Sequence, residues 1–197
     1  MTASGAHELI AIGTSWGGLE VLREILRDLP AELNAAVVIA QHRSPESHPT
    51  AFRDLLAAVT RLKVREAGDK DDLQPGTVYI AAPDYHLLVD PGSLSLSTDE
   101  PVLFARPSID VLLESAAESY RDRCIGVVLT GANDDGALGL ARVVDLGGTA
   151  IIQDPETAQR DEMPRAALRA VPAARVRPVA EIAPLLVDLC GLARVSV

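Results

Sequence analysis

Short apolar runs alternate with amphipathic segments along most of the chain. At residues 35–40 (AAVVIA) and 124–129 (CIGVVL) nearly every side chain is apolar, which is typical of strands buried on both faces of a sheet. Between such runs, Leu, Ile and Val recur three or four residues apart, which is the spacing of one face of a helix. The alternation predicts an α/β fold, with a doubly wound, mostly parallel sheet and helices on both of its faces.

The same pattern places the individual elements. Two brief polar connections, at residues 82–85 and 90–93, favour antiparallel hairpins as a local departure from the parallel arrangement. Strands are predicted at residues 9–12, 35–40, 61–65, 77–81, 86–89, 94–97, 124–129 and 149–152, and helices at residues 22–29, 48–59, 109–116, 138–144, 163 onward and 180–189.

Composition and charge narrow the class of function. The 197 residues suit one domain over residues 1–197, with a core at about residues 8–190. The chain carries 28 acidic and 18 basic side chains, and this net charge of −10 opposes binding to nucleic acid or to an anionic membrane surface. Because no apolar run has membrane-spanning length and the first residues do not read as a secretory signal, we expect a cytoplasmic protein without direct membrane insertion.

The two cysteines, Cys124 and Cys190, fall in a predicted strand and a predicted helix. Their spacing matches neither a metal site nor a disulfide framework. We therefore predict two buried thiols.

A glycine-rich turn joins the first predicted strand to the first predicted helix. Residues 13–18 read GTSWGG, and the three glycines allow a tight backbone with Ser15 at its apex, beside unpaired N–H groups at the helix start. That placement suits a nucleophile and its oxyanion, although Ser15 could also be a helix N-cap. A phosphate-binding loop is disfavoured, because the spacing is not G-x-G-x-x-G, no P-loop lysine follows, and His42 stands where a dinucleotide site would need an acidic residue.

Three side chains suited to hydrolysis follow three predicted strands. Ser15 follows the first strand, His42 follows residues 35–40, and Asp135 follows residues 124–129. If these strands are neighbours in a parallel sheet, the three side chains meet at one edge as a triad in which the imidazole accepts the serine proton and the carboxylate orients the imidazole. The order Ser, His, Asp differs from that of α/β-hydrolases. Without Ser15 and His42, the preferred interpretation of Asp135 would be a carboxylate favoured at a helix N-terminus.

Six motifs, in order along the chain, resemble the catalytic domain of the CheB family of chemoreceptor methylesterases. Members of this family remove methyl esters from receptor glutamates and also deamidate receptor glutamines. The resemblance extends roughly from Leu9 to Cys190. The motifs are GTSWGG at 13–18, QH at 41–42, APDYH at 82–86, RPSID at 106–110, LTG at 129–131 with DGA at 135–137, and MPR at 163–165.

The resemblance implies that Ser15 is the nucleophile, His42 the general base and Asp135 the orienting acid, with Asp134 as the neighbouring alternative. It implies oxyanion donors from two backbone N–H groups and further residues that line the cleft, with no metal or cofactor. The donors would belong to Trp16 and Ala132, and the other cleft residues would be Gly17, Arg106 and Met163. Arg106 could instead form an ordinary helix-start ion pair with Asp110.

The resemblance also implies that the partners are the cytoplasmic helices of methylated chemoreceptors. The sequence contains no counterpart of the family's receiver domain and linker, so we expect a free-standing catalytic domain whose control could lie in a separate regulatory protein. Trp16 stands where the family usually has a small residue after the nucleophile, and Ala132-Asn133-Asp134 stands where the family commonly has Met-Gly-Asn. These departures motivate an alternative: a catalytically degenerate relative that binds receptors or a signalling partner without turnover.

Overall fold

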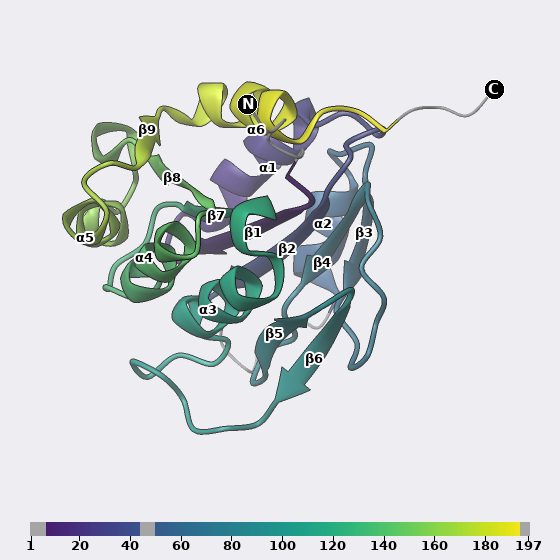
Figure 1. The fold of residues 1–197 in the computed structure, drawn as a ribbon, viewed down its shortest axis with the longest axis horizontal. Helices are drawn as coiled ribbons and strands as arrows, with labels where there is room; N and C mark the ends of the chain where they lie inside the picture. The colour runs from purple at the N-terminus through teal and green to yellow at the C-terminus, as the bar shows by residue number, and fades with distance from the viewer. Residues whose placement is uncertain (1–6, 44–49, 194–197) are drawn as a thin grey trace.

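One parallel sheet forms the centre of the molecule in the computed structural model, which describes residues 7–43 and 50–193 (Figure 1). Within these residues the sheet has seven strands, and a separate antiparallel pair lies beside it. In spatial order the sheet consists of β3 (Lys63–Glu66), β4 (Thr77–Ile80), β2 (Ala36–Gln41), β1 (Leu9–Thr14), β7 (Cys124–Val128), β8 (Thr149–Gln153) and β9 (Arg175–Arg177). The antiparallel pair consists of β5 (His86–Asp90) and β6 (Ser93–Ser97).

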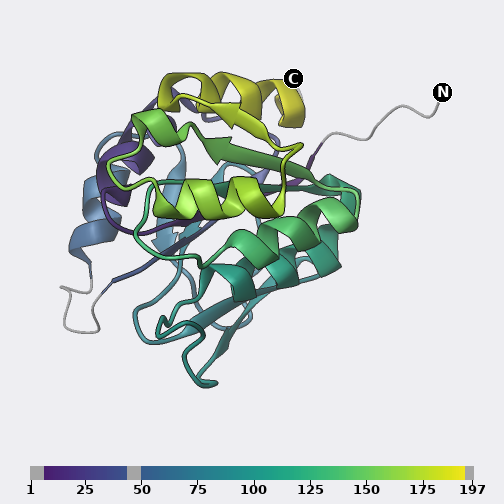
Figure 2. The ribbon, with the colours of Figure 1, turned by 90° about the vertical axis from the view of Figure 1, so that its left-hand side faces the viewer.

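Helices cover both faces of the sheet, as Figures 1 and 2 show. The helices are α1 (Gly18–Asp28), α2 (Ala51–Ala57), α3 (Ile109–Tyr120), α4 (Ala137–Asp145), α5 (Glu162–Ala170) and α6 (Val179–Cys190), with short 3-10 turns η1 (Arg121–Arg123) and η2 (Pro155–Thr157). The predicted doubly wound α/β class is confirmed. No helix within the described ranges is long and apolar enough to cross a bilayer.

Alternation along the strands divides the core into two layers. In β1, Leu9 and Ala11 pack into the layer with α3, α4 and α5, whereas Ile10 and Ile12 pack into the layer with α1, α2 and α6. Successive side chains of a strand point to opposite faces, so a continuously apolar strand is what a sheet covered on both sides requires.

One predicted connection is wrong, and one strand is missing from the prediction. The strand predicted at residues 77–81 does not form a hairpin with the next one, because β4 joins the parallel sheet between β2 and β3, and only β5 and β6 form a hairpin. The short edge strand β9 was not predicted, because its sequence Arg-Val-Arg contains a single apolar residue. The predicted start of the second helix, at residues 48–49, lies outside the described residues.

The order in which strands are added to the sheet changes direction at β1. From β1 it continues to β2 on one side, and it later returns to place β7 on the other side. In doubly wound sheets, ligands bind outside the carboxyl ends of the strands at such a switch point. The loops that follow β1, β2 and β7 therefore form the expected site.

Candidate active site

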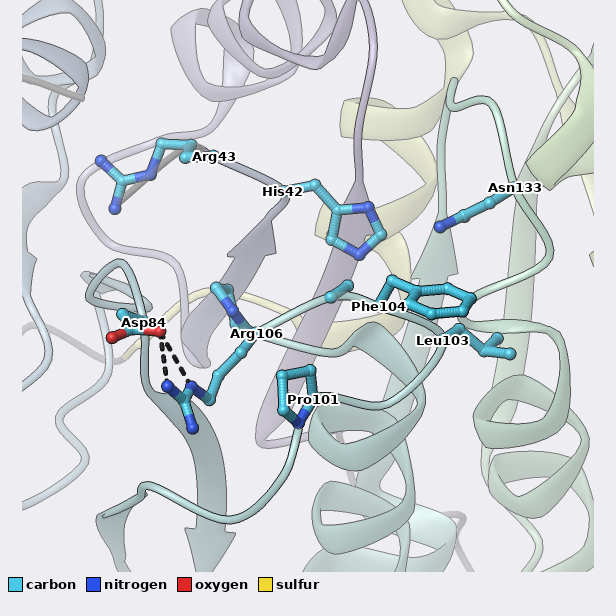
Figure 3. Close-up of a pocket in the computed structure, with 10 residues that line it drawn as sticks. His42, Arg43, Asp84, Pro101, Leu103, Phe104, Arg106 and Asn133 are labelled. Carbon is cyan, nitrogen blue, oxygen red and sulfur yellow. Dashed lines mark hydrogen bonds and ion pairs between the residues drawn. The ribbon is translucent and has the colours of Figure 1, made fainter. Parts of the chain in front are cut away.

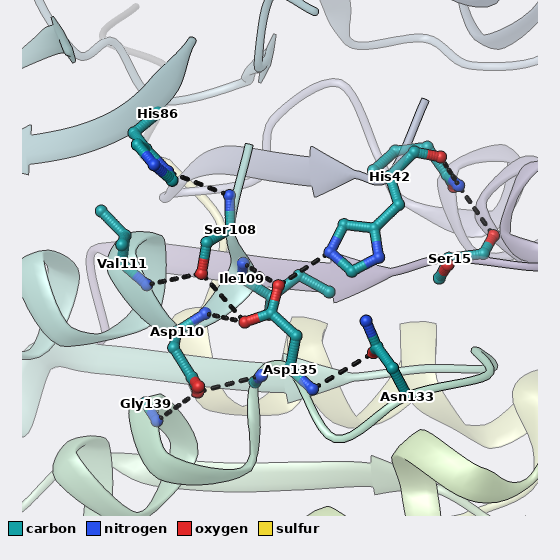
Figure 4. A network of polar contacts seen from close by, with 12 residues as sticks. Ser15, His42, His86, Ser108, Ile109, Asp110, Val111, Asn133, Asp135 and Gly139 are labelled. Atoms are coloured by element: carbon teal, nitrogen blue, oxygen red, sulfur yellow. Dashed lines mark hydrogen bonds and ion pairs between the residues drawn. The ribbon is translucent and has the colours of Figure 1, made fainter. Parts of the chain in front are cut away.

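The carboxyl ends of β1, β2 and β7 bring three distant loops together. Thr14 and Gln41 are paired residues in β1 and β2, and the backbone N–H of His42 donates to the Thr14 carbonyl at 3.1 Å. On the other side, the N–H of Ser15 donates to the carbonyl of Thr130, just beyond β7, at 3.0 Å. Ser15 therefore lies between the loop that carries His42 and the loop that carries Asp135 (Figure 4).

A hydrogen bond joins two members of the predicted triad. His42 Nε2 lies 2.7 Å from Asp135 Oδ2, and the Asp135 side chain is fully buried. An ionised carboxylate only accepts, so Nε2 carries the proton and Nδ1 is left as an acceptor. The side of the imidazole away from Asp135 faces Ser15 in Figure 4. No hydrogen bond joins the Ser15 hydroxyl to another described residue. Before substrate binds, the hydrogen bonds of catalytic groups are often long or poorly aligned.

The N-terminus of α3 holds the Asp135 carboxylate. The N–H groups of Ile109 and Asp110 donate to Oδ2 and Oδ1 at 2.7 and 2.9 Å, and the Ser108 hydroxyl donates to Oδ1 at 2.9 Å. Burial alone would raise the pKa of Asp135, but the hydrogen bond from His42 and these backbone donors outweigh burial and hold the pKa below its ordinary value. Asp135 is therefore ionised and can orient the imidazole.

Asp110 makes the reciprocal contact with the N-terminus of α4. Its Oδ1 accepts the N–H groups of Gly136 and Gly139 at 2.9 and 2.7 Å. Burial raises the pKa of Asp110 to about 6, and the nearby charge of Asp135 adds to the shift, against the two backbone donors. The sequence placed Asp110 in the first turn of a helix but carried no signal for this pairing with the next helix, because the contact joins residues 26 and 29 positions apart.

Two residues of the quoted motifs, Gln41 and His86, position the loops of the predicted triad through contacts that the motifs themselves did not indicate. Gln41 Nε2 donates to the carbonyls of Ser15 and His42 at 2.7 and 3.1 Å, and it thereby joins the ends of β1 and β2. His86 is buried, and its Nδ1 accepts the N–H of Ser108 at 3.1 Å. His86 thus positions Ser108, whose hydroxyl donates to Asp135, and does not itself contact Asp135.

Asp134, the alternative acid, lies away from the imidazole. Its side chain is 71 % exposed, and Oδ1 lies 3.8 Å from Arg169 Nη2. The neighbouring Asn133 accepts the backbone N–H of Asp135 at 3.1 Å. The loop between β7 and α4 therefore places the carboxylate of Asp135, and not that of Asp134, against His42.

Backbone donors are available next to Ser15. Among hydrogen bonds between described residues, the N–H groups of Trp16 and Ala132 have no acceptor. Gly17 follows with φ 80°, a conformation that a residue with a Cβ adopts only with strain, and this turn starts α1 behind Ser15. The two N–H groups are therefore candidate donors to an oxyanion formed at Ser15.

Met163 packs beneath the loop that follows β7 and is buried, so it does not line the surface of the cleft. It is 1 % exposed, and its N–H donates to the Gly131 carbonyl at 3.0 Å. A Cβ built on Gly131 would lie 1.8 Å from Met163 Sδ and 2.9 Å from Ser15 Cβ. Glycine is therefore required at 131 for the loop to pass between the two side chains.

Arg106 borders the cleft, but its guanidinium is already occupied. Nε and Nη2 donate to Asp84 Oδ1 at 3.0 and 2.6 Å, as the dashed lines of Figure 3 show, and Nη1 donates to the carbonyls of Thr98 and Asp99. The ion pair with Asp110 considered from the sequence is wrong, because Asp110 is directed to α4. Arg106 anchors the loop between β6 and α3.

Two cavities open at this edge of the sheet, one beside Ser15 and one beside His42. One, of about 420 Å³, is mostly apolar and has Ser15, Trp16, Phe52 and Leu55 in its wall. The Trp16 side chain is 61 % exposed, with the Arg160 guanidinium 5.7 Å from its ring. The other cavity, of about 510 Å³, has a wall formed partly by His42. No group of three or more metal-binding side chains is gathered in the described parts of the chain.

Comparisons with known proteins show the family to which the chain is similar. A family model described as CheB methylesterase matches residues 10–186. A Leptospira interrogans protein named "Putative protein-glutamate methylesterase/protein-glutamine glutaminase" is 44 % identical over 184 residues, which cover 93 % of this chain and 95 % of that protein. A Carboxydothermus hydrogenoformans protein named protein-glutamate methylesterase/protein-glutamine glutaminase 1 is 43 % identical over 90 % of this chain but only 54 % of its own length.

The comparison of structures leads to the same family. The crystal structure of the Thermotoga maritima CheB methylesterase catalytic domain matches with a TM-score of 0.88 and 34 % sequence identity, over 93 % of this chain and 99 % of that domain. The match of the sequence over most of the chain and the match of the whole fold thus lead to one family. The chain belongs to the CheB methylesterase family.

Proposed function

We propose that this protein is a serine hydrolase that removes methyl esters from glutamate side chains on the cytoplasmic helices of chemoreceptors. The observation that carries the proposal is the 2.7 Å contact between His42 Nε2 and buried Asp135, at the same sheet edge as Ser15. The names of the relatives support the substrate class. We further propose that the enzyme acts in the cytoplasm and that residues 10–186 form its catalytic unit.

The reaction begins with attack of Ser15 Oγ on the ester carbonyl. As the new C–O bond forms, the hydroxyl proton passes to Nδ1 of His42, and the Asp135 carboxylate stabilises the imidazolium. The N–H groups of Trp16 and Ala132 stabilise the oxyanion of the tetrahedral intermediate, and each such donor typically contributes about 10²–10³ in rate. Collapse of the intermediate breaks the bond to the methoxy group, which takes the proton from His42 and leaves as methanol.

Water completes the cycle. His42, now neutral again, accepts a proton from water as the water oxygen attacks the acyl-enzyme, and the bond to Ser15 Oγ breaks with return of that proton. The product is a glutamate carboxylate. The same steps with ammonia as the leaving group would deamidate a glutamine, and the double name of the relatives favours testing this second reaction at the same site.

Methanol release from a methylated chemoreceptor tests the proposal. We expect wild-type protein to release methanol and Ser15→Ala to fall to background, because no other group takes the nucleophile's place. A Ser93→Ala variant, on β6 away from the site, is the matched control and should keep wild-type activity.

Labelling with a fluorophosphonate separates the enzyme from the non-catalytic binding module. Only an activated serine reacts, so wild type should label while Ser15→Ala and His42→Ala should not. Binding of receptor by wild type with neither labelling nor methanol release would favour the degenerate relative.

A further inference from the structure

A tight turn between β6 and α3 presents two bulky apolar residues in an unusual backbone conformation. Val102 and Ala105 exchange two backbone hydrogen bonds, of 3.1 and 2.8 Å, around Leu103 and Phe104. Both central residues have positive φ, 48° and 63°. Two-residue turns with positive φ at both positions strongly favour Asn and Gly, because a side chain resists this conformation. We call residues 102–105 the apolar turn.

The apolar turn leaves its side chains in solvent. Phe104 is fully exposed, Leu103 is 51 % exposed and Val102 is 37 % exposed. Strained backbone persists in proteins mainly where it serves a function. Here the strain holds two large apolar side chains out of the core, so packing within the chain does not compensate for it.

The apolar turn borders the proposed catalytic site. Leu103, Phe104 and His42 line the same cavity of about 510 Å³, and Figure 3 shows the Phe104 ring directed to the region beside the imidazole. Leu103 also lines a third cavity, of about 500 Å³, on the side of α4. Leu138 of α4 lines this cavity too, and it is 68 % exposed. The apolar turn therefore lies between the cavity beside His42 and the exposed Leu138 of α4, although charged side chains such as Asp134 and Arg169 also line these cavities.

The base of the apolar turn is firmly held. Arg106, the next residue, pairs with Asp84 through two nitrogens and donates to the carbonyls of Thr98 and Asp99. The N–H of Asp84 in turn donates to the Arg106 carbonyl at 3.3 Å. The loop projects from the body of the molecule at the lower left of Figure 1, and these contacts fix it to the β4–β5 connection.

We propose that Leu103 and Phe104 dock against apolar side chains along one face of a helix of the protein substrate. This contact places the ester group of the substrate at Ser15. This inference rests on the proposed function. A helix is favoured over a strand as the occupant, because the backbone groups of Val102 and Ala105 bond to each other and leave side chains as the binding elements. A small ester has no helix to contact Leu103 and Phe104, so the apolar turn contributes to binding of the protein substrate only.

The variant Leu103→Asn/Phe104→Gly tests this role, because it supplies the residues that the turn conformation favours and removes both apolar side chains. We expect its Tm to equal or exceed that of wild type. Its KM for methylated chemoreceptor should rise by about 10- to 100-fold, as for the loss of a binding hot spot, while kcat stays within about twofold. Hydrolysis of p-nitrophenyl acetate and fluorophosphonate labelling should be unchanged.

Two controls sharpen the result. Phe104→Leu keeps an apolar anchor and should retain a KM within about threefold of wild type. Leu192→Asn removes an equally exposed leucine beyond α6 and should change neither KM nor kcat. An unchanged receptor KM in the double variant, or an equal loss on receptor and p-nitrophenyl acetate, would overturn the inference.

Failure of the proposed function remains distinguishable from failure of the apolar turn. In a Ser15→Ala background, which cannot turn over, receptor affinity is measured directly with and without the Leu103→Asn/Phe104→Gly change. Weaker binding by about tenfold or more supports the docking role even if wild type releases no methanol. Equal binding refutes it whatever the activity.

Discussion

Two buried carboxylates, Asp110 and Asp135, each cap the helix to which the other is attached. Asp135 precedes α4 and accepts donors at the start of α3, whereas Asp110 lies in α3 and accepts donors at the start of α4. Negative charge is stabilised at a helix N-terminus, but two adjacent buried charges repel. The environment therefore separates the pair: the pKa of Asp135 lies below its ordinary value and that of Asp110 rises to about 6.

This separation predicts how stability depends on pH. Between the ordinary pKa of 3.8 and about 6, folded protein holds a proton on Asp110 that unfolded protein has released. The free energy of unfolding contributed by Asp110 should therefore fall as pH rises through this range, by about 1–4 kcal/mol, and stay constant above it. Asp110→Asn keeps an oxygen for Gly136 and Gly139 but cannot ionise.

Urea unfolding from pH 4 to 7.5 checks this prediction. The stability of wild type minus that of Asp110→Asn should decline through the range and then level off. A difference that does not vary with pH would show that Asp110 titrates alike in both states.

The loop between β7 and α4 is held by contacts with several other elements. Thr130 donates its N–H to Gln153 Oε1 at 2.9 Å, at the end of β8, and the Gly131 N–H donates to the Arg160 carbonyl at 3.0 Å. Met163, at the start of α5, packs against Gly131. The position of Asp135 and of the Ala132 N–H thus depends on the packing of β8 and α5.

The contact between Gly131 and Met163 gives a prediction for this loop. Gly131→Ala should lower the free energy of unfolding by about 1–3 kcal/mol through overpacking, and it should reduce fluorophosphonate labelling because the new Cβ also meets Ser15. Met163→Ala alone should cost about 2–5 kcal/mol through the cavity it leaves.

The double variant Gly131→Ala/Met163→Ala isolates the contact. Since Met163→Ala removes the clashing sulfur, the double variant should be more stable than the sum of the single effects, by about 0.5–3 kcal/mol. Chemical denaturation of the four proteins measures this coupling, and strict additivity would argue against direct packing as the cause.

The two core layers share the strands of one sheet. Cys124 is buried in the layer with α3, α4 and α5, and Cys190 in the layer with α1, α2 and α6, so the predicted buried thiols report on opposite faces. Burial raises the pKa of each thiol to about 12. Because α6 packs on α1 and the N–H of Asn34 donates to the Gly191 carbonyl at 3.2 Å, the end of α6 is tied to the sheet.

Thiol labelling therefore tests whether the molecule unfolds as one unit. Two single variants, Cys190→Ala and Cys124→Ala, each keep one thiol. The free energy of the opening that exposes this thiol to a disulfide reagent should agree between the two variants within about 1 kcal/mol. A much lower opening free energy for Cys190 would mean that α6 separates from the sheet before the core unfolds.

Local patterning predicted most of the elements, and the exceptions have local causes. Apolar periodicity identified the strands and helices of the core, since buried faces must repeat with the period of their element. It missed β9, whose residues are mostly charged, and it assigned β4 to a hairpin because a short connection was read as a tight turn. The residues of the apolar turn gave no signal, since Leu and Phe are not typical of positive φ.

The sequence by itself determined the fold class, the three strand ends that carry Ser15, His42 and Asp135, and the family resemblance, because each depends on short patterns along the chain. Only the tertiary structure decided that β2, β1 and β7 are neighbours, that Asp110 and Asp135 exchange helix caps, and that Leu103 and Phe104 stand beside His42. These relations join segments tens of residues apart. Packing of the whole chain selects them, and no local period encodes them.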